Sequence, residues 1–349
     1  MKVGVLGASG FVGGELLRIL LRHPSVEVTN ISSREYAGEF VHRAHPHLRG
    51  VSNLQFISYD LEKVVGASDL VFTSLPLKAS LDSIPRLVAA GVKVIDMSPA
   101  YRLPKAEDFQ LHYNMVHPDQ QLLSRFAYGL PELYRSAIAS SNLVANPGCS
   151  ALTAILALAP FAEIVEPHSD IIVDAKVGSS GSGSKPSPAG MHAVRYGTIR
   201  PYKLGNHRHG SEVKAFLRSR GKEGVGVLFS AHAVNMVRGI LVTEYIATSS
   251  PITIKDVWQR LRGMYGQEHF IRLVRDKMGS FKLPDPKISI GSNFCDIGFE
   301  LDPDGRHLMV VAALDNLVKG AAGNAVQCMN VMQGYPESTA LDLIPIFPV

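Results

Sequence analysis

The sequence predicts an α/β fold built from two domains, a doubly wound parallel sheet first and an α+β domain after it. Three observations carry this prediction. Short strand patterns alternate with helical patterns over the first 150 residues, a glycine-rich turn joins the first strand to the first helix, and strands dominate after residue 170. With 349 residues, the chain is long enough for two domains that each bury a core.

The first expected elements are a strand over Lys2–Leu6, a helix that begins at Phe11 and a strand over Val26–Ile31. The turn between the first two reads Gly7-Ala-Ser-Gly10-Phe-Val-Gly13, a G-x-x-G-x-x-G variant of the dinucleotide-binding motif. Its glycines allow a tight turn and a close approach of phosphate to the start of the helix. A chance glycine turn is the alternative, but the strand before the motif and the helix after it favour dinucleotide binding.

The residues at the end of the second strand indicate which dinucleotide the motif binds. Chains that bind NAD usually carry an acidic residue here, which hydrogen-bonds the ribose 2′-hydroxyl. This chain has Ser32, Ser33 and Arg34 instead, followed by Glu35. Hydroxyl and guanidinium groups suit a 2′-phosphate, so we expect NADP rather than NAD. An ordinary exposed arginine is the alternative interpretation of Arg34.

The alternation of strands and helices continues up to residue 145. Strands are expected over Asp69–Leu75, Val92–Asp96 and Leu143–Ala145, with a helix near Ala79–Ala90 between the first two. The nearly continuous apolar runs are typical of parallel strands that helices cover on both faces.

Cys149 is the candidate nucleophile. It follows the turn Asn146-Pro-Gly148 and precedes a run of good helix formers, which places it at the N-terminus of a largely buried helix. The helix dipole and the free N–H groups of a first turn favour the thiolate form of a cysteine. A small buried cysteine without a reactive role is the alternative.

A glycine-serine segment, Gly178-Ser-Ser-Gly-Ser-Gly183, directly follows an expected strand over Asp170–Val177. Two interpretations stay open for it. The segment is either a flexible linker or a loop whose backbone N–H groups form a cradle for an anion.

A basic segment follows, with eight lysines and arginines and a single acid, Glu212, between residues 195 and 222. It contains His207-Arg208-His209, and in an extended conformation the two histidines would face one side and Arg208 the other. One histidine can then act as the acid/base while Arg208 holds an anion. A His-x-His pair can also bind a metal, but no third ligand cluster lies nearby in the sequence. The charge fits an acidic substrate or protein partner better than nucleic acid, because few aromatic residues are interleaved.

The last part of the chain predicts an α+β domain with a mostly antiparallel sheet. A helix over Thr253–Tyr265 carries Trp258, which we expect to pack against other side chains rather than to act on substrate, and a final helix runs from Val318 to about Gln333. β-Branched residues mark four strands, over Val225–Ser230, Ile240–Thr248, Phe294–Leu301 and Leu308–Leu314.

The composition narrows the class of protein. The net charge is +4 and 46% of the residues are apolar, which excludes a disordered, highly charged chain. The three cysteines form no Cys-x-x-Cys pair, so neither a disulfide scaffold nor a structural zinc site is expected. Glycines interrupt the apolar run after Met1, unlike a secretory signal, and the stretch Ala151–Val165 is too short to span a bilayer. We expect a cytoplasmic protein that binds no metal, no membrane and no nucleic acid.

Four motifs in order resemble the N-acetyl-gamma-glutamyl-phosphate reductase family over nearly the whole chain. They are Gly7–Gly13, Asn146–Cys149, His207–Glu212 and the segment Asp315–Ala322. Within that family, three further segments are similar to an archaeal lysine/arginine branch, whose enzymes act on substrates attached to a small acidic amino-group carrier protein, LysW. These segments are Gly178–Gly183, Arg200–His207 and Gly334–Glu337.

The resemblance implies a Rossmann NADP-binding domain over residues 1–148 and a catalytic and oligomerisation domain over 149–315. The second domain is like that of glyceraldehyde-3-phosphate and semialdehyde dehydrogenases, and a C-terminal helix, residues 316–349, returns to the Rossmann domain. A homodimer or homotetramer is implied as well. Cys149 would be the nucleophile and His209 the acid/base, because of the His-x-x-Glu spacing, with His207 as the alternative. The candidate NADP contacts are Gly7, Ser9, Gly10, Phe11, Val12, Gly13, Ser33, Arg34, Glu35 and Asn316, and the candidate substrate contacts are Arg208, Glu212, Ser179 and Ser180.

The reaction that the resemblance implies is the NADPH-dependent reduction of an acyl phosphate to a semialdehyde through a cysteine thioester. It belongs to lysine and arginine biosynthesis, with 2-aminoadipate or glutamate held on LysW. The alternatives are a reductase for free N-acetylglutamyl phosphate, an aspartate-semialdehyde dehydrogenase and a non-catalytic NADP sensor. The His-Arg-His segment argues against an aspartate-semialdehyde dehydrogenase, and a non-catalytic NADP sensor would need no nucleophile at Cys149.

Overall fold

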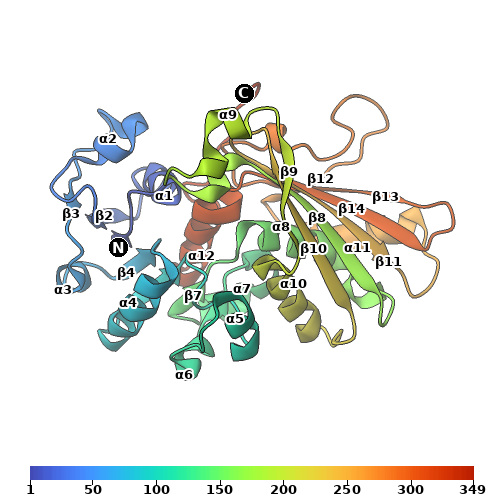
Figure 1. Ribbon diagram of the computed structural model, residues 1–349, viewed down its shortest axis with the longest axis horizontal. Coiled ribbons are helices and arrows are strands. Elements are labelled where there is room, and N and C mark those ends of the chain that lie inside the picture. The colour runs from blue at the N-terminus through green and yellow to red at the C-terminus, as the bar shows by residue number, and fades with distance from the viewer. The chain divides into compact units, whose positions relative to one another are not determined.

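The computed structural model describes residues 1–349, which divide into two compact units with one seven-stranded sheet each (Figure 1). The first unit comprises Met1–Pro147 and Ala321–Leu343, and the second comprises Gly148–Gly320 and Ile344–Val349. The chain therefore passes between the units three times.

The sheet of the first unit is parallel throughout, as the continuous apolar runs predict, with the strand order β3-β2-β1-β4-β5-β7-β6. The strand β4 is buried at all four positions because helices cover both faces of the sheet. The strands are β1 (Lys2–Leu6), β2 (Glu27–Ser32), β3 (Phe56–Ile57), β4 (Leu70–Thr73), β5 (Lys93–Asp96), β6 (Ala127–Tyr128) and β7 (Leu143–Ala145).

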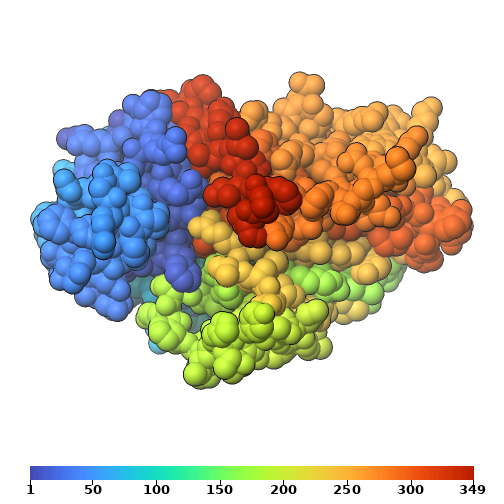
Figure 2. All heavy atoms as spheres, turned by 90° about the horizontal axis from the view of Figure 1, so that it is seen from above, coloured from blue at the N-terminus to red at the C-terminus, as the bar shows by residue number.

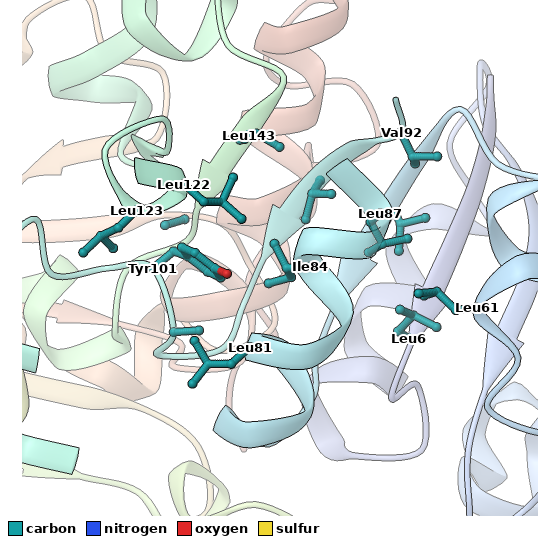
Figure 3. Packing of buried hydrophobic residues seen from close by; sticks show 14 of the residues in the cluster. Leu6, Leu61, Leu81, Ile84, Leu87, Val92, Tyr101, Leu122, Leu123 and Leu143 are labelled. Atoms are coloured by element: carbon teal, nitrogen blue, oxygen red, sulfur yellow. The ribbon is translucent and has the colours of Figure 1, made fainter. Parts of the chain in front are cut away.

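Helices of this unit bury an apolar stripe against the sheet. In α4 the side chains of Leu81, Ile84 and Leu87 recur at helical spacing along one side, and Figure 3 shows them in a cluster that extends from Leu6 to Tyr101. The helices are α1 (Phe11–Leu20), α2 (Val41–Ala44), α3 (Leu61–Val65), α4 (Leu77–Ala89), α5 (Ala106–Tyr113), α6 (Gln120–Leu123), α7 (Pro131–Ala139) and α12 (Gly323–Gln333).

The helix α12 belongs to the first unit although it lies near the end of the chain. It packs on α1, α7 and β5, and nearly all of its side chains are buried. Its polar side chains are hydrogen-bonded there: the amide of Asn324 donates to Gly129 O and Asn146 Oδ1 at 2.6 and 2.7 Å, and that of Gln327 donates to Glu132 Oε1 at 3.0 Å. A π-helical turn over Val318–Ala322 leads into α12.

The segment 316–349 does not belong to the first unit as a whole. Asn316 stays in the second unit because its side chain is hydrogen-bonded to Gly239 and Ser180 there. The last six residues return to the second unit, where Ile346 N donates to Ile290 O at 2.9 Å. Figure 2 shows this dark red end lying on the surface against the orange part of the chain.

The sheet of the second unit is mixed, with the strand order β12-β13-β14-β11-β8-β10-β9. Four strand pairs are antiparallel, as predicted for most of the sheet, while β8 with β10 and β12 with β13 are parallel. The strands are β8 (Asp170–Val177), β9 (Ile199–Gly205), β10 (Gly226–Val234), β11 (Ile240–Ala247), β12 (Ile271–Leu273), β13 (Cys295–Leu301) and β14 (His307–Leu314).

Helices cover one face of this sheet. The helix α8 (Cys149–Leu158) packs on β11 and β14 and is buried from Ser150 to its end, while α10 (Arg208–Ser219) packs on α8 and β10. A third helix, α11 (Ile254–Tyr265), carries Trp258, which packs edge-on against Phe299 as expected. The opposite face of the sheet exposes Ile172, Leu228 and Tyr245. No helix in either unit has both the length and the hydropathy that crossing a bilayer requires.

An ionisable residue, Glu244, lies on the covered face of this sheet. It occupies a buried position of β11 between Val173 of β8 and Val310 of β14, and neither carboxyl oxygen has a hydrogen-bond partner. The helix α8, which packs over this strand, has no charged residue. Burial therefore raises the pKa of Glu244 well above its ordinary value.

Replacing this glutamate by leucine is expected to stabilise the protein more at pH 8 than at pH 5. Because the pKa of Glu244 is raised by folding, the native state holds a proton that the unfolded chain releases above about pH 4.5, so the parent loses stability as the pH rises. We expect Glu244→Leu to add about 1–3 kcal/mol to the free energy of unfolding at pH 8, measured in urea. Glu223→Leu at an exposed site is the control. A gain for Glu244→Leu that is the same at both pH values would contradict the assignment of a buried neutral carboxyl.

Candidate active site

The glycine motif forms the turn between β1 and the start of α1, where Gly10 is the N-cap. Gly7 has a φ of +75°, and a Cβ there would lie 2.4 Å from Ser74 O. A Cβ at Gly13 would lie 2.3 Å from Ala8 O, whereas nothing lies within 4 Å of the corresponding position at Gly10. The first and third glycines thus keep the turn tight, and the second leaves open space at a helix N-terminus, which fits a dinucleotide phosphate.

Hydroxyl groups gather where β1 and β2 end. Ser33 Oγ donates to Ser9 Oγ at 2.9 Å and accepts hydrogen bonds from the backbone N–H groups of Glu35 and Tyr36. Arg34 is exposed, and its guanidinium carbon lies 5.8 Å from the centre of the Tyr59 ring. The structure thus brings Ser9, Ser33 and Arg34 to one end of the parallel sheet, where the ribose of a dinucleotide binds in this fold.

Cys149 is the first residue of α8, as predicted, and it is partly exposed whereas the rest of the helix is buried. Gly148 is the N-cap. Gly320 passes close by, since a Cβ there would lie 2.9 Å from Cys149 Cβ. The first-turn N–H groups of α8 and its dipole favour the thiolate form at this position.

The expected extended conformation is wrong, because His207 and His209 lie at the start of a helix. The two rings nevertheless lie on one buried side with their centres 4.7 Å apart, and Arg208 is exposed, as predicted. His207 is the N-cap of α10, and its Nδ1 accepts a hydrogen bond from His209 N at 3.2 Å. This cap allows the helix to begin at Arg208, which stays exposed. Helical spacing then places His209 and Glu212 three residues apart on one buried face.

His209 and Glu212 pack against the turn that presents Cys149. Glu212 Oε2 accepts a hydrogen bond from Gly148 N at 3.0 Å. A Cβ at Gly148 would lie 2.4 Å from His209 Nε2, so only glycine leaves room for the ring. The carboxylate therefore holds the cysteine-bearing turn to α10, and the imidazole lies against Gly148, the residue before Cys149.

The capping hydrogen bond separates the roles of the two histidines. A ring nitrogen that accepts an N–H bond carries no proton, so in the capped state the proton of His207 is on Nε2. His207 also stacks on Phe229, with ring centres 5.0 Å apart. It could take up a second proton only at Nδ1, at the expense of the cap, and this favours His209 for proton transfer.

Tyr202 also lies at this site, although the sequence analysis did not single it out. Its ring centre is 6.1 Å from that of His207. Burial, and then the nearby charge of Cys149, raise the pKa of Tyr202, while Arg208 and Arg195 lower it in part. Nothing in the sequence of β9 indicates this neighbour, which the fold alone brings to His207.

The segment Gly178–Gly183 is not an anion cradle. The backbone N–H groups of Gly178, Ser179 and Ser180 donate to the carbonyls of Gly239, Met236 and Val237 at 2.9–3.0 Å. The segment forms a 3₁₀ turn over Ser179–Ser182 and is therefore not a free linker at its start. These donors are committed to the chain itself.

Asn316 ties this turn to its neighbour. Its Oδ1 accepts from Gly239 N at 2.8 Å, and its Nδ2 donates to Ser180 Oγ at 2.9 Å. The adjacent Asp315 is fully buried and accepts hydrogen bonds from Arg238 and Gly291 N. The contact of Asn316 with NADP stays a prediction.

Arg102 is a further residue that the sequence analysis missed. It donates to Met97 O at 2.7 Å and to Asn146 O at 2.8 Å, and so anchors the backbone three residues before Cys149. Asp96, at the end of β5, is fully buried and accepts hydrogen bonds from Thr73 and Ser98, and burial raises its pKa to about 6. In the sequence, these two residues could have been found as an Asp at the end of an expected strand followed closely by an Arg.

The basic residues between 195 and 222 do not form one patch. Arg195, Arg200 and Lys203 belong to α9 (His192–Arg195) and β9, the side of the site where Tyr202 lies. Arg218 lies nine residues after His209 along α10, about 14 Å away at the helical rise, and Arg220 follows the end of the helix. Lys222 donates to Glu163 O. The first group and Arg208 border the candidate site, whereas Arg218, Arg220 and Lys222 lie away from it.

The fold and this site define a two-part oxidoreductase that binds a nicotinamide cofactor. Residues 2–141 match the family described as semialdehyde dehydrogenase, NAD binding domain, and residues 149–316 match semialdehyde dehydrogenase, dimerisation domain. The chain therefore belongs to the semialdehyde dehydrogenase family.

Relatives of the same length as this chain are named as one particular kind of reductase. A protein of Cenarchaeum symbiosum is 47% identical over all of both chains, and one of Nitrosopumilus maritimus is 46% identical over all of both. Both are provisionally named LysW-L-2-aminoadipate/LysW-L-glutamate phosphate reductase. A Thermomicrobium roseum protein, 44% identical over 100% of this chain and 99% of its own, is provisionally named LysW-L-2-aminoadipate 6-phosphate reductase.

Solved structures agree on the fold. The aspartate semialdehyde dehydrogenase of Candida albicans with NADP superposes with a TM-score of 0.72 at 18% identity, and that of Vibrio cholerae with 0.70 at 19%. Each comparison covers 95% of this chain and 98% of the other. At such identities the likeness establishes the architecture.

Proposed function

We propose that this protein is an NADPH-dependent reductase that converts a LysW-linked acyl phosphate of 2-aminoadipate, and of glutamate, to the semialdehyde. The observation that carries the proposal is the placement of Cys149 at the start of α8, against His209 and Glu212 of α10. The names of the relatives supply the substrate class and the carrier. Biosynthesis of lysine and arginine is the setting that these substrates imply. A cytoplasmic enzyme is consistent with three free cysteines.

The reaction starts at the sulfur of Cys149. Its thiolate attacks the acyl carbon, the bond from that carbon to the phosphate oxygen breaks, and a thioester forms on the enzyme. Protonated His209 donates its proton to the departing phosphate. Bound NADPH supplies the hydride that reduces the thioester carbon. The carbon–sulfur bond then breaks, the aldehyde leaves, and Cys149 is again a thiolate.

Glu212 and the N-terminus of α8 prepare this chemistry. The hydrogen bond from Gly148 N to Glu212 fixes the turn before the nucleophile, so the thiolate and His209 keep their mutual position. First-turn N–H groups of α8 are proposed to stabilise the negative charge that develops on the acyl oxygen. Arg208, exposed at the first position of α10, is the proposed contact for the substrate's anionic groups.

Arg34 is proposed to select NADPH over NADH. We expect Arg34→Ala to weaken NADPH binding by about 1.5–3 kcal/mol, because a charge-assisted contact with the 2′-phosphate is lost, and to leave NADH binding almost unchanged. Fluorescence titration with each cofactor measures both constants. Arg43→Ala is the control, since Arg43 is exposed in the same unit and pairs only with Glu39. Equal losses for the two cofactors would remove Arg34 from the 2′-phosphate site.

A carrier protein is the proposed partner of the basic surface formed by Arg195, Arg200 and Lys203. We expect reversal of two of its charges, Arg200→Glu with Lys203→Glu, to raise KM for carrier-linked substrate at least tenfold at low salt. The effect should shrink with added salt, and turnover of a small acyl phosphate should change little. The rate of NADPH oxidation measures KM for the carrier-linked substrate, its dependence on salt and the turnover of the small acyl phosphate.

The matched control reverses Arg218 and Arg220, which lie at the far end of α10. If both double variants behave alike, the surface does not guide the carrier. If free N-acetylglutamyl phosphate is the better substrate at every salt concentration, the protein is an arginine-pathway reductase for a free substrate. An NADP sensor without catalysis would oxidise no NADPH with any of these substrates.

We propose a homodimer formed through the open face of the second sheet. Ile172, Leu228 and Tyr245 are exposed there in one chain, and the matching family is described as a dimerisation domain. Tyr245→Glu should shift the protein toward monomer in sedimentation.

A further inference from the structure

His45, which follows α2 in the connection between β2 and β3, lies against the glycine turn of the first unit. The side chain is buried, with 4% of its surface exposed, and its Nε2 lies 2.7 Å from Ala8 O. Ala8 is the residue between Gly7 and Ser9, so the imidazole holds the middle of the turn that fits a dinucleotide phosphate.

Gly14 shows how closely this ring is fitted. The G-x-x-G-x-x-G pattern ends at Gly13 and does not require a fourth glycine. A Cβ at Gly14 would lie 2.5 Å from His45 Nδ1 and 2.7 Å from its Cε1. Even the smallest side chain would displace the ring, so Gly14 and His45 form a matched pair.

The hydrogen bond determines which way a peptide group points. A carbonyl oxygen can only accept, so Nε2 of His45 carries the proton, and burial lowers the pKa of the ring so that it is neutral at pH 7. In a trans peptide the C=O and the following N–H point in opposite directions. With Ala8 O bound to His45, Ser9 N–H points away from the histidine. If the Ala8–Ser9 peptide were rotated by half a turn, the carbonyl oxygen of Ala8 would lie where Ser9 N–H now lies.

We propose that His45 is a positioning residue of the cofactor site, which keeps the Ala8–Ser9 peptide oriented so that its N–H, and not its carbonyl, is presented to the pyrophosphate of the dinucleotide. The carbonyl of Ala8 is enclosed between His45 on one side and Gly13 on the other. This inference rests on the cofactor site of the proposed function and is independent of the acyl substrate and of Cys149.

The first test is a titration of the full-length protein with NADPH in the absence of acyl substrate, in which we expect His45→Ala to raise Kd for NADPH at least tenfold. A separate assay with acyl phosphate and saturating NADPH should give a kcat within twofold of the parent. His45→Gln, whose amide N–H can reach Ala8 O, should recover most of the affinity. His47→Ala is the control, because His47 is exposed and its ring centre lies 5.9 Å from that of His45.

A second variant tests the matched pair. Gly14→Ala alone should weaken NADPH binding, and in the His45→Ala background it should cause little further loss, because the ring it displaces is gone. An unchanged Kd for folded His45→Ala, or no recovery with His45→Gln, would show that the ring only fills space. Because the Kd for NADPH is measured directly, the role of His45 can be decided even if the protein does not reduce acyl phosphates.

Discussion

Replacing Cys149 by serine is expected to reduce turnover on the order of 10³-fold or more while NADPH binding stays intact. The helix start that favours a thiolate does little for a hydroxyl, whose proton is far less acidic near neutral pH, so the acyl-enzyme would form slowly. Steady-state NADPH oxidation gives the rate. Rapid mixing with acyl phosphate shows whether a burst of phosphate release, the sign of a thioester, disappears.

The control for this variant is Cys295→Ala. Cys295 forms no disulfide and lies buried in β13. The Cys295→Ala variant should keep the turnover of the parent and should still be inactivated by alkylation. Acyl phosphate should protect against this alkylation only in proteins that contain Cys149. Turnover of Cys149→Ser within a few-fold of the parent would remove the cysteine from the mechanism.

Replacing His209 by asparagine is expected to slow the chemical step by about 10²–10⁴-fold, the usual contribution of a general acid/base. Single-turnover kinetics isolate this step from product release. The pH profile should also lose the limb that reports the histidine, and a structural role alone would not remove that limb.

His207→Asn is the matched comparison, because asparagine is among the best N-cap residues and preserves the start of α10. We expect a small effect on the chemical step, since the Nδ1 of His207 is occupied by the capping hydrogen bond. A larger defect for His207→Asn than for His209→Asn would exchange the two roles.

Periodicity and glycine chemistry were enough to predict much of this molecule. The alternation of apolar runs predicted the parallel sheet, and the position of Cys149 between a Pro-Gly turn and a run of helix formers predicted its place at the start of α8. Both features depend on residues that are neighbours in the sequence, where local conformational preferences decide the outcome.

Features that depend on distant partners were not predictable. The sequence His207-Arg208-His209 is equally compatible with an extended segment and with the start of a helix. The capping hydrogen bond that His207 accepts favours the helix. The N–H groups of Gly178–Ser180 would suit an anion if the carbonyls of residues 236–239 did not accept them. Arg102 acts on Asn146, 44 residues away along the chain. In each case a tertiary contact determines which of two locally reasonable interpretations is correct.

The late position of α12 has a consequence for synthesis of the protein. The first unit is covalently discontinuous, and its parallel sheet is covered in part by a helix that begins at Gly323. On the ribosome, residues 1–147 therefore emerge long before the helix that buries their apolar surface and engages Gly129 and Asn146. The first unit is thus completed only after the whole sheet of the second unit has been synthesised, and its unfinished parallel sheet exposes apolar surface during that time.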